Sequence, residues 1–463
     1  MQKLIKKVVS LFSSNSVEPA SYSVNCKVIP CQEHNISRSQ IDKGALDVLY
    51  GLKRAGYDAY LVGGAVRDLL IGLEPKDFDI ATNAEPEQIK RVFKHRCRLI
   101  GRRFRLAHVH FGRNVIEVAT LRGDGEGESS QVSRKKLNHT RATNDAGKLL
   151  RDNVYGTIDT DAYRRDFTVN SLYYDIKTFS VLDYTGAMED IKKGQLRLIG
   201  DPKTRYREDP VRMIRAIRFA AKLGFEIEEA TKAPIYKMGS LLKDVSHARM
   251  FEEVLKMFHS GVGVEVLRQL RYYQLFQYIF PQTNELFDNP EDSFPEKLII
   301  EALKSTDIRI KSGKGVNPSF LFAVMLWEPM MNRMEAYLDD DLTHQDALHA
   351  AANDVIGAQI SSTAIPKRFT AQIREIWSLQ FRLPRYKGAR AQKLREHVRF
   401  RAAYDFIAIR VAAGEDELAP IFDWWTEYQV KNPIDQVAFA NDLRNKERKR
   451  QPRKGRNPYR KRA

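Results

Sequence analysis

Cysteine is scarce in this sequence, with three residues, Cys26, Cys31 and Cys97, among 463. Three cysteines cannot all pair, and no set of Cys and His at zinc-finger spacing lies near Cys26 and Cys31. Disulfides persist mainly in oxidising compartments. The cysteine content therefore favours a reducing cytoplasm and argues against a structural metal site.

Long apolar runs are also missing. The N-terminal MQKLIKKVVSLFSSNS contains lysines and a short, interrupted apolar run, much shorter than a secretory signal requires. No later segment supplies the roughly 20 apolar residues that a membrane-spanning helix needs. We expect no transmembrane segment and a flexible tail over residues 1–35, with a weak amphipathic contact to a membrane surface as the alternative for that tail.

Residues arranged for nucleophilic catalysis are not apparent. No Ser/His/Asp or Cys/His set stands out. His108 and His110 alternate on a predicted strand without a third metal ligand nearby, so we interpret both as structural.

Positive charge is abundant and unevenly distributed. The formal net charge is +17, and the last twenty residues, 444–463, hold eleven Lys/Arg and one acid, so ten of those charges lie in the tail. Such a block cannot form a core, and we predict a disordered arm over 441–463 that binds a polyanion, with RNA favoured over a merely solubilising role.

The most informative stretch is DAYLVGGAVRDLLIGLEPKDFDIATN, residues 58–83. It predicts two strands, the second holding Asp77 and Asp79. Side chains at i and i+2 of a strand share a face, so these two carboxylates repel each other unless a cation lies between them. Hard oxygen ligands at this spacing suit Mg²⁺, which takes one or two carboxylates together with substrate phosphates. A pair of surface aspartates in a turn is the plainer alternative.

A double glycine, Gly63 and Gly64, stands fourteen residues before the first of these aspartates. Residues without Cβ atoms let backbone N–H groups approach a phosphate, and a helix N-terminus behind them favours negative charge. Each motif alone is common, but their joint spacing is specific. The pattern predicts a metal and phosphate site.

The surrounding sequence alternates helix and strand signals. Helices are expected over 40–53 and 85–94, and strands over 97–100, 106–111 and 115–120, with a further strand over 195–199. Alternation of this kind predicts an α/β domain with a mixed sheet. The polar, glycine-rich segment 123–148 is too long for an ordinary connection and is expected to be a mobile substrate-covering loop or disordered.

Two later segments carry further charged candidates. DAYRRDFTVNSLYY contains Arg164, Arg165 and Asp166 next to an element start, where they can face the same site as the aspartate pair. The helical segment YREDPVRMIRAIRFAAKLGF places Asp209 and Arg212 three residues apart. An ordinary ion pair from Glu208 or Asp209 to Arg212 is the simpler interpretation.

The remaining chain shows only helical patterns. One basic region interleaves cations with Tyr386 and Phe400, which suits single-stranded nucleic acid through phosphate neutralisation and base stacking, although a solvated helix face explains the same residues. The cations of this region are Arg382, Arg385, Lys387, Arg390, Lys393, Arg395, Arg399 and Arg401. Three other aromatic residues are expected in the core, namely Trp424, Trp425 and Tyr428.

Taken together, LVGGAVRDLLIG with PKDFDIAT, RRDFTVNSLYY and REDPVRMIRAIRFAAKLGF closely resemble the bacterial poly(A) polymerases. These enzymes belong to the nucleotidyltransferase superfamily that also contains the CCA-adding enzymes. The run LIGRRFRLAHV, the helical second half and the basic tail are similar to the polymerase branch. The resemblance implies a polymerase-β-type head over 36–200, a helical neck over 201–280, and a helical RNA-binding region over 281–440.

The resemblance also implies roles for individual residues. Asp77 and Asp79 match the carboxylates that hold two Mg²⁺ ions, for which Mn²⁺ can substitute, and Asp166 matches a third active-site carboxylate. ATP is the implied substrate. The matching nucleotide-binding positions are Gly63, Gly64, Arg67, Arg164, Arg165, Asp209 and Arg212. Glu117, on the strand over 115–120, is our own additional candidate for a metal-site carboxylate.

The expected activity is template-independent transfer of AMP to RNA 3′ ends in the cytoplasm, promoting RNA decay. CCA addition to tRNA is the alternative, and a non-catalytic RNA-binding protein that kept the fold is the alternative of another class. An Arg/Asp pair complements cytosine as well as adenine, so ATP selectivity does not follow from Asp209 and Arg212. The expected partners are single-stranded 3′ ends of mRNA, small RNA and tRNA precursors, the RNA-degradation machinery and an Sm-like RNA chaperone, around a monomeric protein.

Overall fold

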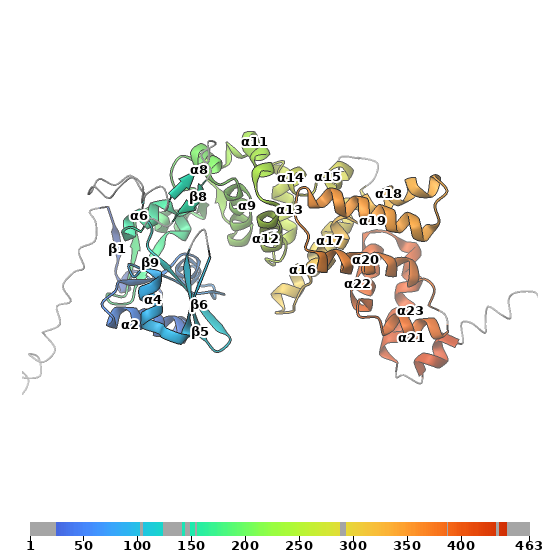
Figure 1. Cartoon of the computed structure of the whole chain (residues 1–463), viewed down its shortest axis with the longest axis horizontal. Coiled ribbons are helices and arrows are strands. Elements are labelled where there is room, and N and C mark those ends of the chain that lie inside the picture. The colour runs from blue at the N-terminus through green and yellow to red at the C-terminus, as the bar shows by residue number, and fades with distance from the viewer. Residues whose placement is uncertain are drawn as a thin grey trace, which may run out of the picture. The chain divides into compact units, whose positions relative to one another are not determined.

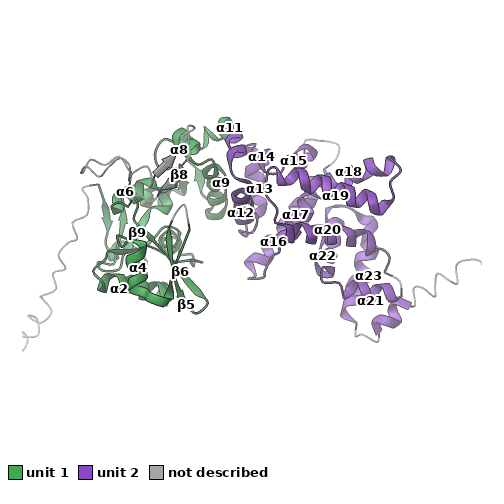
Figure 2. Cartoon of the chain, viewed as in Figure 1, with its two compact units in different colours: residues 1–238 green, residues 239–463 purple. Residues whose placement is uncertain are grey.

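The computed structural model divides into two compact units, residues 1–238 and 239–463 (Figure 2). The residues described are 25–101, 105–123, 141–143, 149–152, 155–287, 293–386, 388–431 and 435–441. The basic tail over 444–463 and most of the segment 123–148 lie outside these ranges. In the described part of the chain, no helix combines the length and apolar character that crossing a membrane requires.

An eight-stranded mixed sheet forms the centre of the first unit (Figure 1). All neighbouring strands are antiparallel except β3 and β6, which are parallel. In spatial order the strands are β1 (Lys27–Ile29), β10 (Ser180–Asp183), β9 (Leu172–Asp175), β2 (Ala59–Val62), β3 (Asp79–Thr82), β6 (Asn114–Thr120), β5 (Leu106–Phe111) and β4 (Cys97–Ile100). The predicted α/β class with a mixed sheet is confirmed.

Both faces of this sheet are covered, as the alternation along β2 illustrates. Leu61 belongs to the larger core, whereas Tyr60 and Val62 belong to a second cluster on the opposite face. The larger core also takes the apolar side of α2 (Lys43–Arg54) and Ile89 of α4 (Pro86–Phe93). The central strands are therefore buried on both sides, and only their ends are available to form a site.

The remaining elements of the first unit connect or extend this sheet. Its other helices are α3 (Gly64–Leu70), α6 (Ile158–Arg164), α7 (Ala187–Lys193), α8 (Pro202–Glu208), α9 (Val211–Leu223), α10 (Glu229–Lys232) and α11 (Ile235–Met238). Two small sheets pair β11 (Gln195–Leu196) with β12 (Glu226–Ile227), and β7 (Arg141–Thr143) with β8 (Leu149–Asp152). The segment 123–148, expected to lack regular structure, thus contributes the strand β7.

Two details of the predicted motifs differ from the structure. Asp77 does not lie in a strand, because β3 begins at Asp79, which pairs with Val62, the last residue of β2. The backbone of β2 turns away at Gly63, so no partner strand extends alongside Asp77. The helix expected from 206 onward is divided, since α8 ends at Glu208 and α9 begins after Pro210.

The second unit is helical. Its helices are α12 (His247–Phe258), α13 (Gly263–Tyr272), α14 (Phe276–Ile279), α15 (Pro281–Phe287), α16 (Phe294–Lys311), α17 (Pro318–Met325), α18 (Trp327–Asp339), α19 (His344–Ile360), α20 (Lys367–Arg382), α21 (Ala389–Arg395), α22 (Phe400–Ala413) and α23 (Ala419–Val430). Between α13 and α14, Gln274 has a φ of 56°. Leu326 separates α17 from α18.

The aromatic residues of the basic region are core residues. Phe400 is buried, and the Tyr386 ring stacks on Trp424 at 4.4 Å between centroids. Trp424, Trp425 and Tyr428 belong to the same cluster, as expected. The burial of Phe400 argues against its stacking on nucleic-acid bases. Tyr386 is only partly buried against this cluster, so its contact with RNA stays a prediction, as does that of the cations of the region.

Candidate active site

The aspartate pair lies at the exposed end of the two central strands. Asp77 precedes β3 and Asp79 is its first residue, and both side chains contact solvent. The parallel register of β3 with β6, Ile80 opposite Val118, places Glu117 beside Asp79. The predicted DxD pair and the additional candidate Glu117 thus meet at one edge of the sheet.

Electrostatic crowding among these carboxylates is visible at Asp79. Partial burial and the negative charges of Glu117 and Asp77 raise the pKa of Asp79 to about 6, and Arg165 offsets this only in part. Adding positive charge between the carboxylates removes that repulsion. The arrangement at Asp79 is therefore suited chemically to a bound cation.

A divalent cation fits two carboxylates here better than a complete protein cage. Among the described residues, no three His, Cys, Asp or Glu side chains are close enough to hold an ion. Glu117 Oε2 instead lies 3.5 Å from Nε2 of His108 on β5. Two carboxylates that leave further positions to water and substrate phosphates are typical of Mg²⁺ sites.

The glycine turn after β2 brings the backbone close to the partly buried Arg165. Gly63 has φ 71° and ψ −131°, a combination that residues with a Cβ avoid, and it precedes α3. A Cβ atom added at Gly63 would lie 3.2 Å from Nη1 of Arg165. At Gly64 the nearest atom would be Nη2 of Arg67 at 3.5 Å, an ordinary contact. Gly63 is thus the member of the pair that the local structure requires.

Arg165 is fixed beneath this turn by a network of hydrogen bonds. Its Nε and Nη2 donate to Oδ2 of Asp161 at 3.2 and 3.1 Å, and Nε also donates to the Tyr173 hydroxyl at 2.9 Å. Nη1 donates to the carbonyl of Asn170 at 3.3 Å. Burial would lower the pKa of Arg165, but Tyr173 and Asp161 outweigh it and raise that pKa. Arg165 is therefore a fixed positive charge close enough to act on Asp79.

Arg67 is buried in the first unit, with 2% of its side chain exposed. Nε donates to Oδ1 of Asp68 at 2.9 Å, and Nη1 hydrogen-bonds Oδ1 of Asn170. The guanidinium also lies over the Phe219 ring, 5.6 Å from its centroid. In this structure Arg67 therefore joins α3, η4 (Thr168–Asn170) and α9, and its contact with phosphate stays a prediction.

Asp166 is engaged by an arginine that the sequence motifs did not single out. Oδ2 accepts hydrogen bonds from Nε and Nη2 of Arg215 on α9 at 2.8 and 2.5 Å. Oδ1 accepts from the Phe167 amide at 2.8 Å and from Asn170 Nδ2 at 3.3 Å. Burial alone would raise the pKa of Asp166, but Arg215 and these hydrogen bonds hold it at about 2. In this structure Asp166 ties the head to α9.

A second arginine outside the motifs, Arg205 of α8, makes a parallel connection. Its Nη2 donates to the carbonyls of Arg164 and Arg165 at 2.7 and 2.6 Å. The Arg164 side chain itself donates to the Gly123 carbonyl. The segment between α6 and η4 is therefore held to α8 through its backbone. No local sequence pattern predicts this role of Arg205, because the carbonyl groups that it binds lie about 40 positions earlier in the chain.

The EDPVR element contains the ordinary ion pair that was the simpler interpretation. Arg212 Nη1 donates to Glu208 Oε2 at 3.1 Å and to the Arg205 carbonyl at 2.8 Å. Asp209 lies at the break between α8 and α9 and is half-buried. Glu208 is thus a carboxylate that orients the Arg212 side chain.

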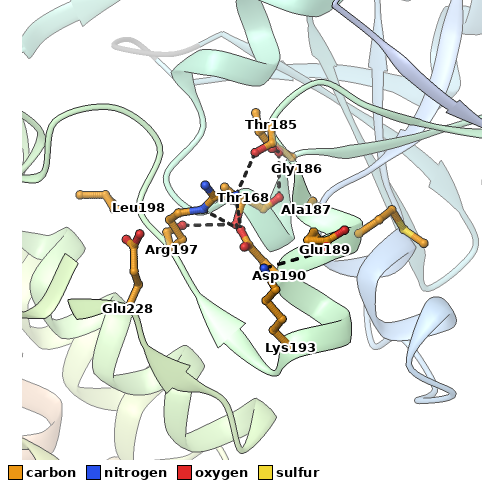
Figure 3. Close-up of polar contacts among 12 residues, drawn as sticks. Thr168, Thr185, Gly186, Ala187, Glu189, Asp190, Lys193, Arg197, Leu198 and Glu228 are labelled. Carbon is orange, nitrogen blue, oxygen red and sulfur yellow. Dashed lines mark hydrogen bonds and ion pairs between the residues drawn. The ribbon is translucent and has the colours of Figure 1, made fainter. Parts of the chain in front are cut away.

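Figure 3 shows a polar network that anchors the segment following Asp166. Asp190 of α7 is buried, and its Oδ2 accepts hydrogen bonds from Thr168 Oγ1 at 2.6 Å and from Arg197 Nε at 2.9 Å. Arg197 Nη2 also donates to the Thr185 carbonyl at 3.3 Å. This network fixes η4 to the helix and strand that follow it, and thereby the position of Asp166 and Asn170.

The same sequence segments match known protein families. Three family models align, described as "Poly A polymerase head domain" over residues 59–197, "Probable RNA and SrmB- binding site of polymerase A" over 224–287 and "Polymerase A arginine-rich C-terminus" over 340–461. Together they account for more than half of the chain. The first contains both Asp77 and Asp166, and the last contains Arg399 and Arg401.

Individual relatives give the same result. A Poly(A) polymerase I from Escherichia coli O6:H1 is 49% identical over 455 residues, covering 97% of this chain and 96% of that protein. A CCA-adding enzyme from Geobacillus kaustophilus is 36% identical over 235 residues, covering 51% of this chain and 54% of that protein. The solved Thermotoga maritima CCA-adding enzyme complexed with tRNA has a TM-score of 0.54 at 20% identity, covering 87% and 86% of the two chains, which is a likeness of fold.

Replacing Gly63 by alanine tests the role of the turn. We expect Gly63→Ala to lower the free energy of unfolding by about 3 kcal/mol, because left-handed backbone strain of about 1–2 kcal/mol adds to the approach to Arg165. Gly72→Ala is the matched control, since Gly72 has φ 76° and nothing within 4 Å of an added Cβ. Urea unfolding measures both variants, and equal losses would contradict a special constraint at Gly63.

Removing the positive partner of Asp166 tests the link to α9. We expect Arg215→Gln to cost about 2 kcal/mol of unfolding free energy, less than the 3–5 kcal/mol of a fully buried pair because Arg215 keeps some solvent contact. Arg105→Gln is the control, because its pair with Glu87 is exposed on both sides and such pairs contribute about 0–1 kcal/mol.

The pH dependence of this difference follows from the low pKa of Asp166. The folded-state pKa of about 2 lies below the unfolded value of about 3.9. The stabilisation is therefore complete above about pH 4 and is lost as the pH falls towards 2. The difference between wild type and Arg215→Gln, followed by urea unfolding, should be constant from pH 5 to 8 and shrink on acidification; a difference unchanged at pH 2 would argue against this ion pair.

Proposed function

This chain belongs to the bacterial poly(A) polymerase family, and from that premise we propose that it adds AMP from ATP to RNA 3′ ends without a template, using Asp77 and Asp79 to hold divalent metal ions. The observation that carries the mechanistic part is the meeting of Asp77, Asp79 and Glu117 at one edge of the sheet, where burial and the two neighbouring carboxylates raise the pKa of Asp79 to about 6. Carboxylates that repel one another in the absence of a cation suit a site whose cations bind together with a nucleoside triphosphate.

We propose Mg²⁺ as the metal, with Mn²⁺ able to replace it. Both candidate ligands are carboxylates, which are hard oxygen ligands. Within the described ranges, no three His, Cys, Asp or Glu side chains form a cluster that could hold a metal ion. These features support an ion that completes its coordination shell with phosphate oxygens. When bound, a pair of such ions polarises the attacking 3′-oxygen and neutralises the pyrophosphate leaving group in an in-line displacement. Glu117, beside Asp79, adds negative charge that increases cation affinity.

The surrounding arginines act mainly by position. Arg165 supplies a fixed positive charge next to the Gly63 turn, which suits orientation of a triphosphate. Asp166 stays ionised because Arg215 holds its pKa at about 2, so it acts as a rigid anchor of the segment that carries Arg165. Arg67 and Arg164 support this framework through hydrogen bonds to Asn170 and to the Gly123 carbonyl, respectively.

Base recognition falls to the break between α8 and α9. Arg212 is oriented by Glu208, and the half-buried Asp209 lies at the break beside it. The two side chains offer hydrogen-bond donors and an acceptor, which can pair with the Watson–Crick edge of adenine. We propose that this element reads the incoming ATP.

The cellular setting follows from the same proposal. Single-stranded 3′ ends of mRNA, small RNA and tRNA precursors are the proposed substrates, and their polyadenylation is proposed to promote decay. Cys26, Cys31 and Cys97 are all unpaired, consistent with a cytoplasmic enzyme. Contacts with the RNA-degradation machinery and an Sm-like chaperone, and a monomeric state, remain predictions.

Nucleotide preference distinguishes polyadenylation from CCA addition. Purified full-length protein with a single-stranded RNA, Mg²⁺ and one nucleotide at a time should extend the RNA by many residues with ATP and by few or none with CTP, GTP or UTP. Denaturing gels resolve the products. Addition limited to two or three nucleotides and dependent on CTP would contradict the proposal.

Removing both aspartates separates catalysis from RNA binding. We expect Asp77→Ala with Asp79→Ala to reduce the AMP-transfer rate by at least 10³-fold, since the charge that holds the cations is lost. RNA affinity, measured by fluorescence anisotropy, should change less than twofold. Glu74→Ala removes an exposed acid from the same loop and should keep wild-type activity. An active double variant would overturn the assignment, and loss of RNA binding would instead indicate a folding defect.

A further inference from the structure

The second unit contains a pocket of about 370 Å³ that the reaction chemistry does not use. Its walls come from α16, α17 and the beginning of α22, three helices that lie near one another in Figure 1, together with His259 after α12. The loop from Gly315 to Asn317 between α16 and α17 closes one side. This volume is near the lower end of the range of about 300–1,000 Å³ for small-molecule sites, so it suits a ligand group of modest size.

Three arginines line the pocket against a single acid. Arg309 comes from α16, Arg399 precedes α22 and Arg401 lies in its first turn, while Asp405 is the one carboxylate among the lining residues. The arginines therefore converge from two separate elements. A net positive lining of this kind attracts phosphate, which guanidinium groups bind through paired N–H donors.

The arginines keep donors available. Arg309 Nη2 donates to the Gly315 carbonyl at 3.2 Å, and Arg399 Nε donates to Glu375 Oε2 at 3.2 Å. Arg401 Nε forms an ion pair with Asp405 Oδ1 at 2.9 Å. Each of these contacts engages one guanidinium nitrogen, whereas a guanidinium carries five N–H donors. The contacts fix the three side chains near the pocket and leave the other N–H donors of each guanidinium for a ligand.

The remaining lining is apolar or neutral. Phe320, Leu321 and Val316 contribute apolar surface, and Val398 at the rim is 82% exposed. Burial lowers the pKa of His259 to about 4, so its imidazole is neutral at physiological pH and offers one donor and one acceptor. Apolar surface beside arginines and a neutral hydrogen-bonding ring matches a nucleotide, which combines a flat base with an anionic phosphate.

We propose that this pocket binds one nucleotide of the RNA strand upstream of the 3′ end that the active site extends, with the phosphate on Arg309, Arg399 and Arg401 and the base against Phe320 and Val398. The inference rests on the proposed function, which supplies an RNA strand. An acidic peptide would use the arginines but not an apolar wall next to them, so RNA is the better match. Holding the strand away from the reacting end explains how an enzyme with no template retains its RNA.

Full-length variants with an internal control test this site. Arg309→Gln and Arg401→Gln should each weaken binding of a 20-nucleotide single-stranded A-rich RNA about tenfold at 0.1 M salt. The slope of log affinity against log salt should fall by about 0.7 for each phosphate that the variant no longer neutralises. Arg333→Gln is the matched control, because Arg333 is also an exposed arginine of the second unit in an ion pair, 3.1 Å from Asp354. It removes the same charge and should change affinity less than twofold.

A crosslinking measurement gives a result that does not depend on variants. RNA carrying 4-thiouridine at internal positions should crosslink to wild-type protein within 315–320 or 398–402. Equal effects of Arg309→Gln, Arg401→Gln and Arg333→Gln, or crosslinks confined to other segments, would overturn the proposal. Displacement of bound RNA by free AMP is expected only at millimolar concentration; tight AMP binding that leaves RNA bound would show a separate small-ligand site and count against it.

These outcomes are separable from failure of the proposed function. If wild-type protein adds no AMP to RNA, the proposed function fails whatever the pocket does. If wild-type protein extends RNA with ATP and the pocket variants behave as Arg333→Gln does, only the pocket assignment fails. The KM for ATP should be unchanged in all three variants, since the pocket residues belong to the second unit and are not part of the nucleotide site.

Discussion

Three carboxylates gathered at one end of the sheet are the constraint on which the proposed site depends. Asp77, Asp79 and Glu117 come from the start of β3 and the neighbouring β6, and burial together with the charges of Glu117 and Asp77 raises the pKa of Asp79. Such an arrangement costs stability when nothing neutralises it. In the proposed reaction, cations and the triphosphate that they accompany complete the site.

Holding these carboxylates in place requires a rigid surrounding, and partly buried arginines provide it. Arg215 binds Asp166, Arg165 binds Asp161, and Arg205 binds the backbone between them. The links of Arg215 and Arg205 join different elements of the first unit, whereas that of Arg165 closes the end of α6. The catalytic end of the sheet is therefore fixed to α8 and α9, which carry the residues proposed to read the base, so that metal binding and base recognition share one framework.

Local spacing predicted the centre of the site but not its supports. The glycine pair, the i and i+2 aspartates and the strands β4 and β5 follow from patterns within a few residues, although Asp77 itself precedes its strand. Arg215 could not be singled out, because its partner Asp166 is 49 positions away. Arg67 was predicted to contact phosphate since it follows the glycines, and its hydrogen bond to the distant Asn170 was not predicted. Tyr386 and Phe400 were predicted to stack on bases because the basic segment has no regular apolar pattern from which buried side chains could be identified.

The central claim is that Asp77 and Asp79 together hold the divalent metal ions. Titration of Mn²⁺ into full-length protein with a non-hydrolysable ATP analogue, followed by the electron paramagnetic resonance signal of free Mn²⁺, measures this directly. The account predicts that wild-type protein takes up Mn²⁺ and that Asp77→Asn with Asp79→Asn does not, while the variant keeps its fold. Uptake by the variant with the same affinity and stoichiometry as wild type would contradict it.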